Sequence, residues 1–251
     1  MGDQAAPAFY ARHGSAVSDW WTLLHPPYTA WHLSYVVLGA AIAPATDWAA
    51  LGFSVLAFFL AVGLAAHALD ELQGRPLRTG IPSATLWAVA GLSLTGAVAL
   101  GVVGAFFWDG TSWPLVVAIP LGALLVVGYN LELFDRRLHT DHVFAWGWGG
   151  FPVVVGFLAQ SPDMTAGLVV AAVAMTLAAV GTSYAQRRLS TPARRLRRDT
   201  TAVAGSLTTS DGAAVPLDRA VLLTPLEGAL RALSWALPMT AVAVLLAGSG
   251  R

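Results

Sequence analysis

Seven long apolar stretches follow one another along the chain, separated by short segments that hold most of its charged residues. The apolar core of a bilayer is about 30 Å thick, so a helix needs about 20 residues to cross it. Stretches of this length and polarity predict transmembrane helices. They cover residues 28–44, 48–69, 82–107, 113–131, 143–158, 164–184 and 233–247. The pattern therefore predicts an all-α polytopic membrane bundle with about seven spans, forming a single domain over residues 1–251.

The composition agrees with lipid as the main solvent of the chain. Hydrophobic residues make up 56% of it and charged residues 11%, whereas a soluble domain carries about 25% charged residues. Basic and acidic residues balance at 14 each, so the electrostatic footprint of a nucleic-acid-binding protein is missing. The chain contains neither cysteine nor lysine, which excludes thiolate ligands, cysteine nucleophiles and lysine Schiff bases.

The positions of the arginines indicate how the bundle is oriented. Arginines occur in the connections after the second, fourth and sixth predicted spans, whereas the connections after the first, third and fifth hold only aspartate among the charged residues. By the positive-inside bias, the N-terminus and the arginine-bearing loops are expected in the cytoplasm. An arginine-only, alanine-rich composition is typical of a GC-rich bacterial genome, so we expect a bacterial cytoplasmic membrane.

The longest polar stretch precedes the last predicted span. Residues 187–216 become rich in alanine, threonine, serine and glycine, which predicts a flexible cytoplasmic loop. Residues 217–231 mix leucines with four charged residues and contain Pro225. This second pattern predicts an amphipathic helix at the membrane interface, and an eighth span is the alternative for the same segment.

A short motif recurs in the predicted cytoplasmic loops. Residues 71–79 and 132–140 share the pattern E-L-x-x-R-x-L-x-T, and residues 187–191 repeat its second half. Each copy follows an even-numbered span. The recurrence indicates a bundle built from repeated helical hairpins.

Carboxylates and arginines cluster at the inner ends of the predicted spans, where ionisable residues are costly and are therefore paired or functional. Carboxylates bind magnesium, which bridges to substrate phosphates, and arginines bind phosphate oxygens through paired hydrogen bonds. An apolar interior suits a long lipid tail, so we expect an enzyme that acts on a prenyl diphosphate or a related lipid. The candidate catalytic carboxylates are Asp70, Glu71, Asp135 and Asp141, and the candidate phosphate ligands are Arg75, Arg78, Arg136 and Arg137.

Three neighbouring segments carry a family pattern. Residues 25–39 begin with His-Pro-Pro-Tyr, residues 63–71 read Gly-Leu-Ala-Ala-His-Ala-Leu-Asp-Glu, and residues 75–80 read Arg-Pro-Leu-Arg-Thr-Gly. In order and topology they resemble the first span, the end of the second span and the following loop of the UbiA-type intramembrane prenyltransferases. Residues 129–137 are similar in position to the aromatic and basic stretch of that family.

The resemblance implies magnesium-assisted prenyl transfer, or a related ionisation or cyclisation, at the cytoplasmic face. His67 stands where the family usually has asparagine, and no carboxylate lies between Ser183 and Arg198, where the second aspartate-rich motif of the family belongs. The chain therefore resembles a diverged member, with seven predicted spans instead of the usual nine. The implied metal ligands are Asp70, Glu71 and His67, and the implied substrate-binding residues are Arg75, Arg78, Tyr129, Asn130, Arg136 and Arg137.

Two other classes of function remain open. All six histidines fall on the predicted inner side of the bundle, and imidazole with carboxylate suits iron or zinc better than magnesium. A metalloenzyme acting on a membrane lipid is one alternative, and a non-enzymatic transporter or membrane partner protein is the other. The sequence leaves the acceptor, the prenyl chain length and the oligomeric state open. The alternative metal set is His32, His67, His139 and His142.

Overall fold

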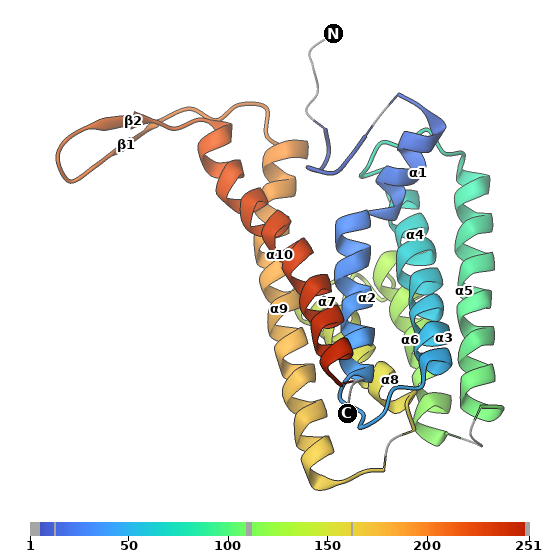
Figure 1. Ribbon diagram of the computed structural model, residues 1–251. Helices are drawn as coiled ribbons and strands as arrows, with labels where there is room; N and C mark the ends of the chain where they lie inside the picture. Colours follow the sequence, from blue (N-terminus) through green and yellow to red (C-terminus); the bar gives the residue numbers. More distant parts are fainter. Residues whose placement is uncertain (1–5, 13, 109–111, 162, 249–251) are drawn as a thin grey trace.

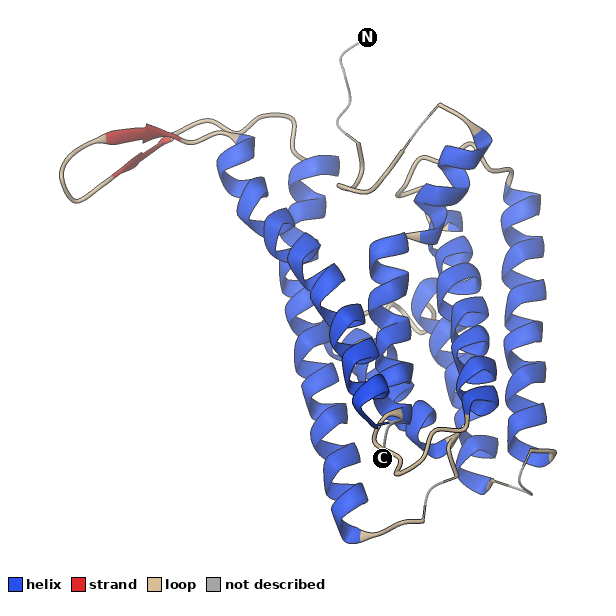
Figure 2. Cartoon of the chain, in the orientation of Figure 1, coloured by secondary structure: helices blue, strands red, loops and turns tan. Residues whose placement is uncertain are grey.

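A computed structural model describes residues 6–12, 14–108, 112–161 and 163–248, and most of them are helical (Figures 1 and 2). Within these ranges, five helices are long and apolar enough to cross a membrane. They are Trp48–Leu72 (α3, η1 and α4 in one continuous run), Ser83–Phe106 (α5), Trp113–Asn130 (α6), Ala166–Arg198 (α9) and Arg219–Gly248 (α10). The predicted helical membrane bundle is confirmed at this level.

The first and fifth predicted spans are also helical but shorter. Residues Pro26–Ala40 form α2, and the run of α7 (Asp141–Phe144), η2 (Ala145–Gly150) and α8 (Phe151–Leu158) replaces the stretch predicted at 143–158. Whether these two elements cross the membrane stays a prediction, and so does the count of seven. Ahead of α2 lies a short helix that the apolar pattern did not predict, α1 (Ala16–Leu24).

Helix α2 is the central element of the bundle, between α10 and the α3–α4 run (Figure 1). Nine of its 15 residues are buried, and Trp31, Tyr35 and Val36 are fully enclosed. The outer helices bury far less, and apolar residues such as Leu92 on α5 and Val170 on α9 are 76% and 68% exposed. Lipid can cover these outer faces, whereas the polar side chains of α2 must find partners within the protein.

Two glycines allow α2 and α8 to cross at backbone contact. A Cβ atom on Gly39 would lie 2.1 Å from the carbonyl oxygen of Val153, and one on Gly156 would lie 2.2 Å from the carbonyl oxygen of Val36. No side chain larger than hydrogen fits at either position. Small residues serve membrane helices in this way because close packing replaces the hydrophobic driving force that lipid removes.

The arginine-rich segment after the sixth predicted span is part of a helix, so the loop predicted at 187–216 is wrong in part. Helix α9 continues to Arg198, with Ser190 and Ala193 buried. The rest of the segment contains a small antiparallel hairpin of β1 (Ser206–Thr208) and β2 (Ala214–Pro216), whose residues are all exposed. It projects sideways from the bundle, beyond the ends of α9 and α10 (Figure 2).

The separate interfacial helix predicted at 217–231 is also corrected, because those residues belong to α10, which runs without interruption to Gly248. The reason is a partner on α9. The Glu227 carboxylate receives two hydrogen bonds from the Arg197 guanidinium, and Leu230 is 1% exposed. Glu227 therefore faces α9, and Pro225 is accommodated inside the helix.

We expect Gly156→Ala to destabilise the protein by about 1–3 kcal/mol or to abolish its folding, because the new methyl group overlaps the α2 backbone. Gly181→Ala is the matched control, since a Cβ there meets nothing within 4 Å and alanine favours the helix. Thermal unfolding of both variants in detergent measures the difference. Equal stability of the two variants would contradict the backbone contact.

Candidate functional site

The loop between α4 and α5 is organised by a buried carboxylate. Glu71, near the end of α4 (His67–Leu72), is fully buried. Its oxygens accept hydrogen bonds from the amides of Leu77 and Thr79 and from the Thr79 hydroxyl, each at 2.9 Å. Three donors from the protein satisfy this carboxylate, so Glu71 holds the loop and does not face an open metal position.

The same loop carries the two arginines predicted as phosphate ligands. Arg75 and Arg78 both have a φ of 57°, in the left-handed region, a conformation that costs free energy for residues with a Cβ atom. The Arg75 guanidinium donates to the carbonyl oxygen of Ile81 and the hydroxyl of Ser83, both at 2.6 Å. These bonds fix the loop against the start of α5.

A polar cavity of about 450 Å³ opens between this loop and the end of α9. We call it the arginine mouth. Five arginines line it, two from the loop and three from α9, with a single carboxylate, that of Asp199. A cavity with this charge suits an anion with several oxygens, because each guanidinium offers paired donors. Its lining residues are Gly74, Arg75, Pro76, Arg78, Thr191, Arg194, Arg195, Arg198 and Asp199.

The N-terminal segment lies against the same region. Arg198 donates to the carbonyl oxygen of Pro7 at 3.1 Å. Tyr10 is buried, with its ring centroid 5.1 Å from that of His25 and 5.5 Å from that of Tyr28. Burial raises the pKa of Tyr10, mainly by desolvation, so its hydroxyl stays protonated.

Two histidines stack near the start of α2. The rings of His25 and His67 lie 4.1 Å apart at an interplanar angle of 28°. His25 joins α1 to α2, and burial lowers its pKa well below the usual value, with His67 as the next cause. Asp70, half-buried one turn after His67, acts electrostatically on both Tyr10 and His67. Of the predicted carboxylates, Asp70 is therefore the one that lies one turn from this histidine pair without being enclosed.

Three buried polar atoms in this part of the bundle have no hydrogen-bond partner among the described residues: His25 Nε2, the Tyr129 hydroxyl and Gln186 Oε1. Buried polar groups are nearly always satisfied in folded proteins, by protein, water or ligand. The charge of Arg194 acts electrostatically on both His25 and Tyr129. Tyr129, predicted as substrate-binding, is thus a buried residue with an unpartnered hydroxyl.

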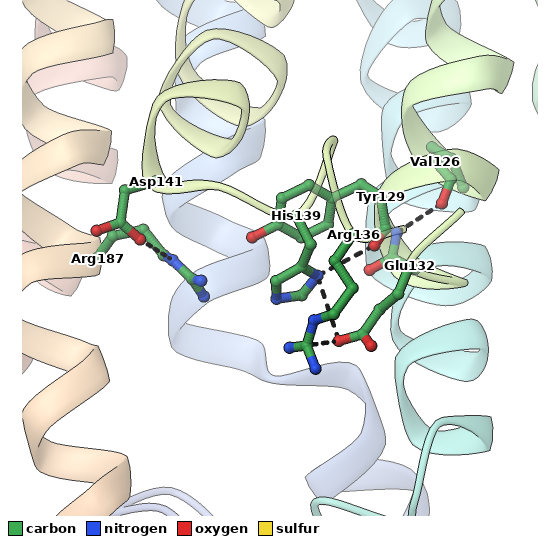
Figure 3. A network of polar contacts seen from close by, with 8 residues as sticks. Val126, Tyr129, Glu132, Arg136, His139, Asp141 and Arg187 are labelled. Atoms are coloured by element: carbon green, nitrogen blue, oxygen red, sulfur yellow. Dashed lines mark hydrogen bonds and ion pairs between the residues drawn. The ribbon is translucent and has the colours of Figure 1, made fainter. Parts of the chain in front are cut away.

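Other predicted residues form a separate network around the second motif copy (Figure 3). Arg136 pairs with Glu132 at 3.0 Å, and Arg187 of α9 donates to Asp141 at 3.2 Å. Asn130 donates to a carbonyl within α6. These groups are already partnered. Asp135 and Arg137 lie exposed on the same loop, and neither they nor Arg136 are among the described residues that line the arginine mouth.

The four histidines of the alternative metal set are held apart by other contacts. Through Nδ1, His32 bonds the Trp148 carbonyl at 2.9 Å, His67 bonds the Gly63 carbonyl and His139 bonds the Tyr129 carbonyl, both at 3.1 Å. His142 stacks on Tyr184. In the described ranges, no three histidine, aspartate or glutamate side chains are close enough together to hold a metal ion.

The carbonyls that bond His32 and His67 belong to the two π-helical segments. Gly63 lies in η1 (Phe59–Ala66) and Trp148 in η2. Such segments are rare and occur frequently at functional sites. Because a carbonyl oxygen only accepts, Nδ1 of each ring carries a proton, and in the neutral ring Nε2 is then an acceptor.

Comparison with known proteins gives no match: no family model fits the sequence, and no curated protein or solved structure is significantly similar to the chain. The UbiA resemblance thus rests on the motifs alone. The residues that the sequence reasoning missed are the three α9 arginines of the mouth, with Tyr10 and His25. The spacing of Arg194, Arg195 and Arg198 was a visible signal, but only the fold brings them to Arg75 and Arg78.

Glu71→Ala is expected to cost about 2–4 kcal/mol, because it leaves the buried Leu77 and Thr79 amides without an acceptor. Glu132→Ala, at the same position of the repeated motif, removes a partly exposed pair with Arg136 and is expected to cost at most about 1 kcal/mol. Thermal or denaturant unfolding in detergent measures both. Equal losses would show that the two glutamates have the same role.

Acidification is expected to destabilise the protein through His25. Because folding lowers the pKa of His25, the unfolded chain binds more protons below about pH 6.5, and stability falls as the pH falls. His67, Arg198, Arg194 and His32 act on it electrostatically, and the rings of Tyr10 and Tyr28 pack against it.

The measurement is the melting temperature between pH 7.5 and 5. His25→Asn keeps a residue that tolerates the left-handed backbone found here, and it should reduce the acid-induced loss by several degrees. His142→Asn, which changes an exposed histidine, should leave that loss unchanged. An unaltered pH profile in His25→Asn would refute the assignment.

Proposed function

We propose that this protein is a membrane-embedded enzyme that acts on an isoprenoid diphosphate. The observation that carries the proposal is the arginine mouth, where five arginines from two distant segments line one cavity at the end of an apolar bundle. Arginine binds phosphate oxygens in a bidentate manner. Fixed positive charge next to a diphosphate also stabilises it as a leaving group.

An apolar cavity inside the bundle supports the binding of a hydrocarbon chain. It measures about 140 Å³ and lies between the α3–η1 run, α5, α6 and the η2–α8 run. Trp148 lines its inner end, and the Trp148 ring lies 4.5 Å from that of Tyr129. Tyr129, whose buried hydroxyl has no partner among the described residues, therefore lies next to this end of the apolar cavity.

The aromatic residues at this end of the apolar cavity suit a carbocation. Phe144 stacks on Trp148 with an interplanar angle of 7°, and Tyr129 contacts both rings. Aromatic faces attract cations, most strongly where water is excluded. An allylic cation formed on the substrate would thus meet π-faces, while its leaving group stays with the arginines.

The proposed reaction begins with cleavage of the bond between the first prenyl carbon and the diphosphate oxygen. The electron pair leaves with the diphosphate, and the allylic cation then bonds to an acceptor or cyclises. We assign Asp70 to accept the proton that the acceptor or the cation releases, since it is a partly exposed carboxylate one turn after His67. By the arginine bias of the loops, this takes place at the cytoplasmic face.

The UbiA resemblance also implies magnesium, but the side chains near the mouth do not fit that ion. Magnesium binds through one or two carboxylates together with substrate phosphates. Here Glu71 is occupied by three protein donors, and the lining holds five arginines against one aspartate. No step of the proposed reaction therefore depends on a metal.

The test is diphosphate release from prenyl diphosphates of several chain lengths by the purified protein in lipid nanodiscs. We expect release by the wild type, and a loss of about two orders of magnitude in Arg194→Gln, the size found when one group that stabilises developing charge is removed. Arg188→Gln is the matched control, because Arg188 is exposed on the same helix and does not line the mouth.

Two results would count against this function. One is the absence of diphosphate release at every chain length tested, with and without an acceptor quinone or phenol. The other is equal activity in Arg194→Gln and the wild type, which would mean that the reacting group binds elsewhere.

A further inference from the structure

The arginines of α9 differ in whether a carboxylate neutralises them. Arg187 pairs with Asp141, and Arg197 pairs with Glu227 on α10. Neither lines the mouth. Among the described residues, no carboxylate comes within ion-pair distance of Arg194, Arg195 or Arg198, which do line it. On α9 the fold therefore pairs Arg187 and Arg197 with carboxylates and leaves the three arginines that line the cavity without one. Arg188 also has no ion pair among the described residues, but it is exposed and lies outside the cavity.

In the loop after α4, too, the carboxylates do not pair with the arginines of the mouth for which contacts are described. Glu71 is the carboxylate nearest in sequence to Arg75, yet it points into the loop, where backbone amides satisfy it. The Arg75 guanidinium donates to a carbonyl and a hydroxyl, which hold it in place without neutralising its charge. Asp199, the only carboxylate in the lining, forms no ion pair within the described ranges.

A protein can bind a diphosphate through a divalent cation or through arginines, and the charges around this cavity favour the second way. A site that uses a divalent cation supplies carboxylates to bind the cation, and the cation then neutralises the phosphates. A site that uses arginines supplies the positive charge and the hydrogen-bond donors directly. A divalent ion in the arginine mouth would lie among like charges, and no group of three potential metal ligands occurs in the described part of the chain.

We infer that the arginine mouth binds a diphosphate group without a divalent metal ion, its charge being balanced by the guanidinium groups of α9 and of the loop after α4. The inference rests on the proposed function and specifies how that site recognises its substrate. It makes Arg194 and Arg195 direct ligands of the anion. Arg75 then contributes as a fixed charge whose position Ile81 and Ser83 determine.

The experiment is titration calorimetry of the full-length protein in detergent with inorganic pyrophosphate, once in excess EDTA and once with magnesium. We expect binding in EDTA, and weaker apparent binding with magnesium, because that ion forms a complex with free pyrophosphate. Arg194→Gln should weaken binding about 10- to 100-fold, the effect of losing one charged hydrogen-bonding group. Arg188→Gln should bind like the wild type.

A conservative variant separates ligand binding from folding. Arg194→Lys keeps the charge and loses the paired donors, so we expect pyrophosphate affinity between those of the wild type and Arg194→Gln. The Arg194→Lys variant should elute from a size-exclusion column at the same volume as the wild type, as a folded protein does. Affinity equal to that of the wild type in both Arg194 variants would overturn the inference.

The remaining outcomes distinguish this inference from the function on which it rests. Binding of pyrophosphate only with magnesium, together with diphosphate release from prenyl diphosphates that EDTA abolishes, would overturn the inference and leave the proposed function intact. No binding in either condition and no release from any prenyl diphosphate would overturn both. Binding and release that persist in EDTA would support both.

Discussion

The close crossing of α2 and α8 is the contact on which the interior of this bundle depends. Gly39 and Gly156 bring the two backbones together, and α2 becomes the element that the other helices surround. Its polar side chains then reach partners on distant segments: His32 bonds Trp148 of η2, and the Ser183 hydroxyl of α9 donates to that of Tyr35. A wider spacing would remove these partners and leave buried polar groups unsatisfied, which is costly. Packing at two glycines therefore determines which polar residues the interior can contain.

The two copies of the E-L-x-x-R-x-L-x-T motif show how one pattern acquires two roles. In the first copy the glutamate is enclosed and accepts backbone hydrogen bonds, so it determines the path of the loop. In the second copy Glu132 is partly exposed and pairs with Arg136. In this second copy, four of the residues from 132 to 136 have left-handed backbone conformations, and Glu132 is one of them. Glu71, the glutamate of the first copy, is helical. Burial makes the difference, because an enclosed carboxylate must be fully satisfied whereas an exposed one is solvated by water.

Charge is distributed along α9 in a way that links stability to the proposed chemistry. The pairs Arg187–Asp141 and Arg197–Glu227 attach α9 to the start of α7 and to α10. Between them, Arg194 and Arg195 face the loop after α4 and add charge to the arginine mouth. Like charges within one cavity repel one another, and the fold tolerates this repulsion because the neighbouring pairs and the Glu71 loop fix both walls. A bound anion would reduce this repulsion between the arginines, and the reduction would add to its binding affinity.

The sequence by itself determined the helical membrane bundle, because apolar length is read directly from the order of residues. It also predicted that Asp70, Arg75 and Arg78 belong to one site, since they follow one another within nine positions. It did not determine the use of Glu71, which depends on which amides the folded loop turns toward it, nor the helical path of residues 187–198. Only the tertiary structure places Arg75 in the same cavity as three arginines of α9, which are Arg194, Arg195 and Arg198. These groups are more than 100 residues apart in the sequence, and helix packing, which depends on side-chain shape at crossings such as Gly39 and Gly156, brings them into one cavity.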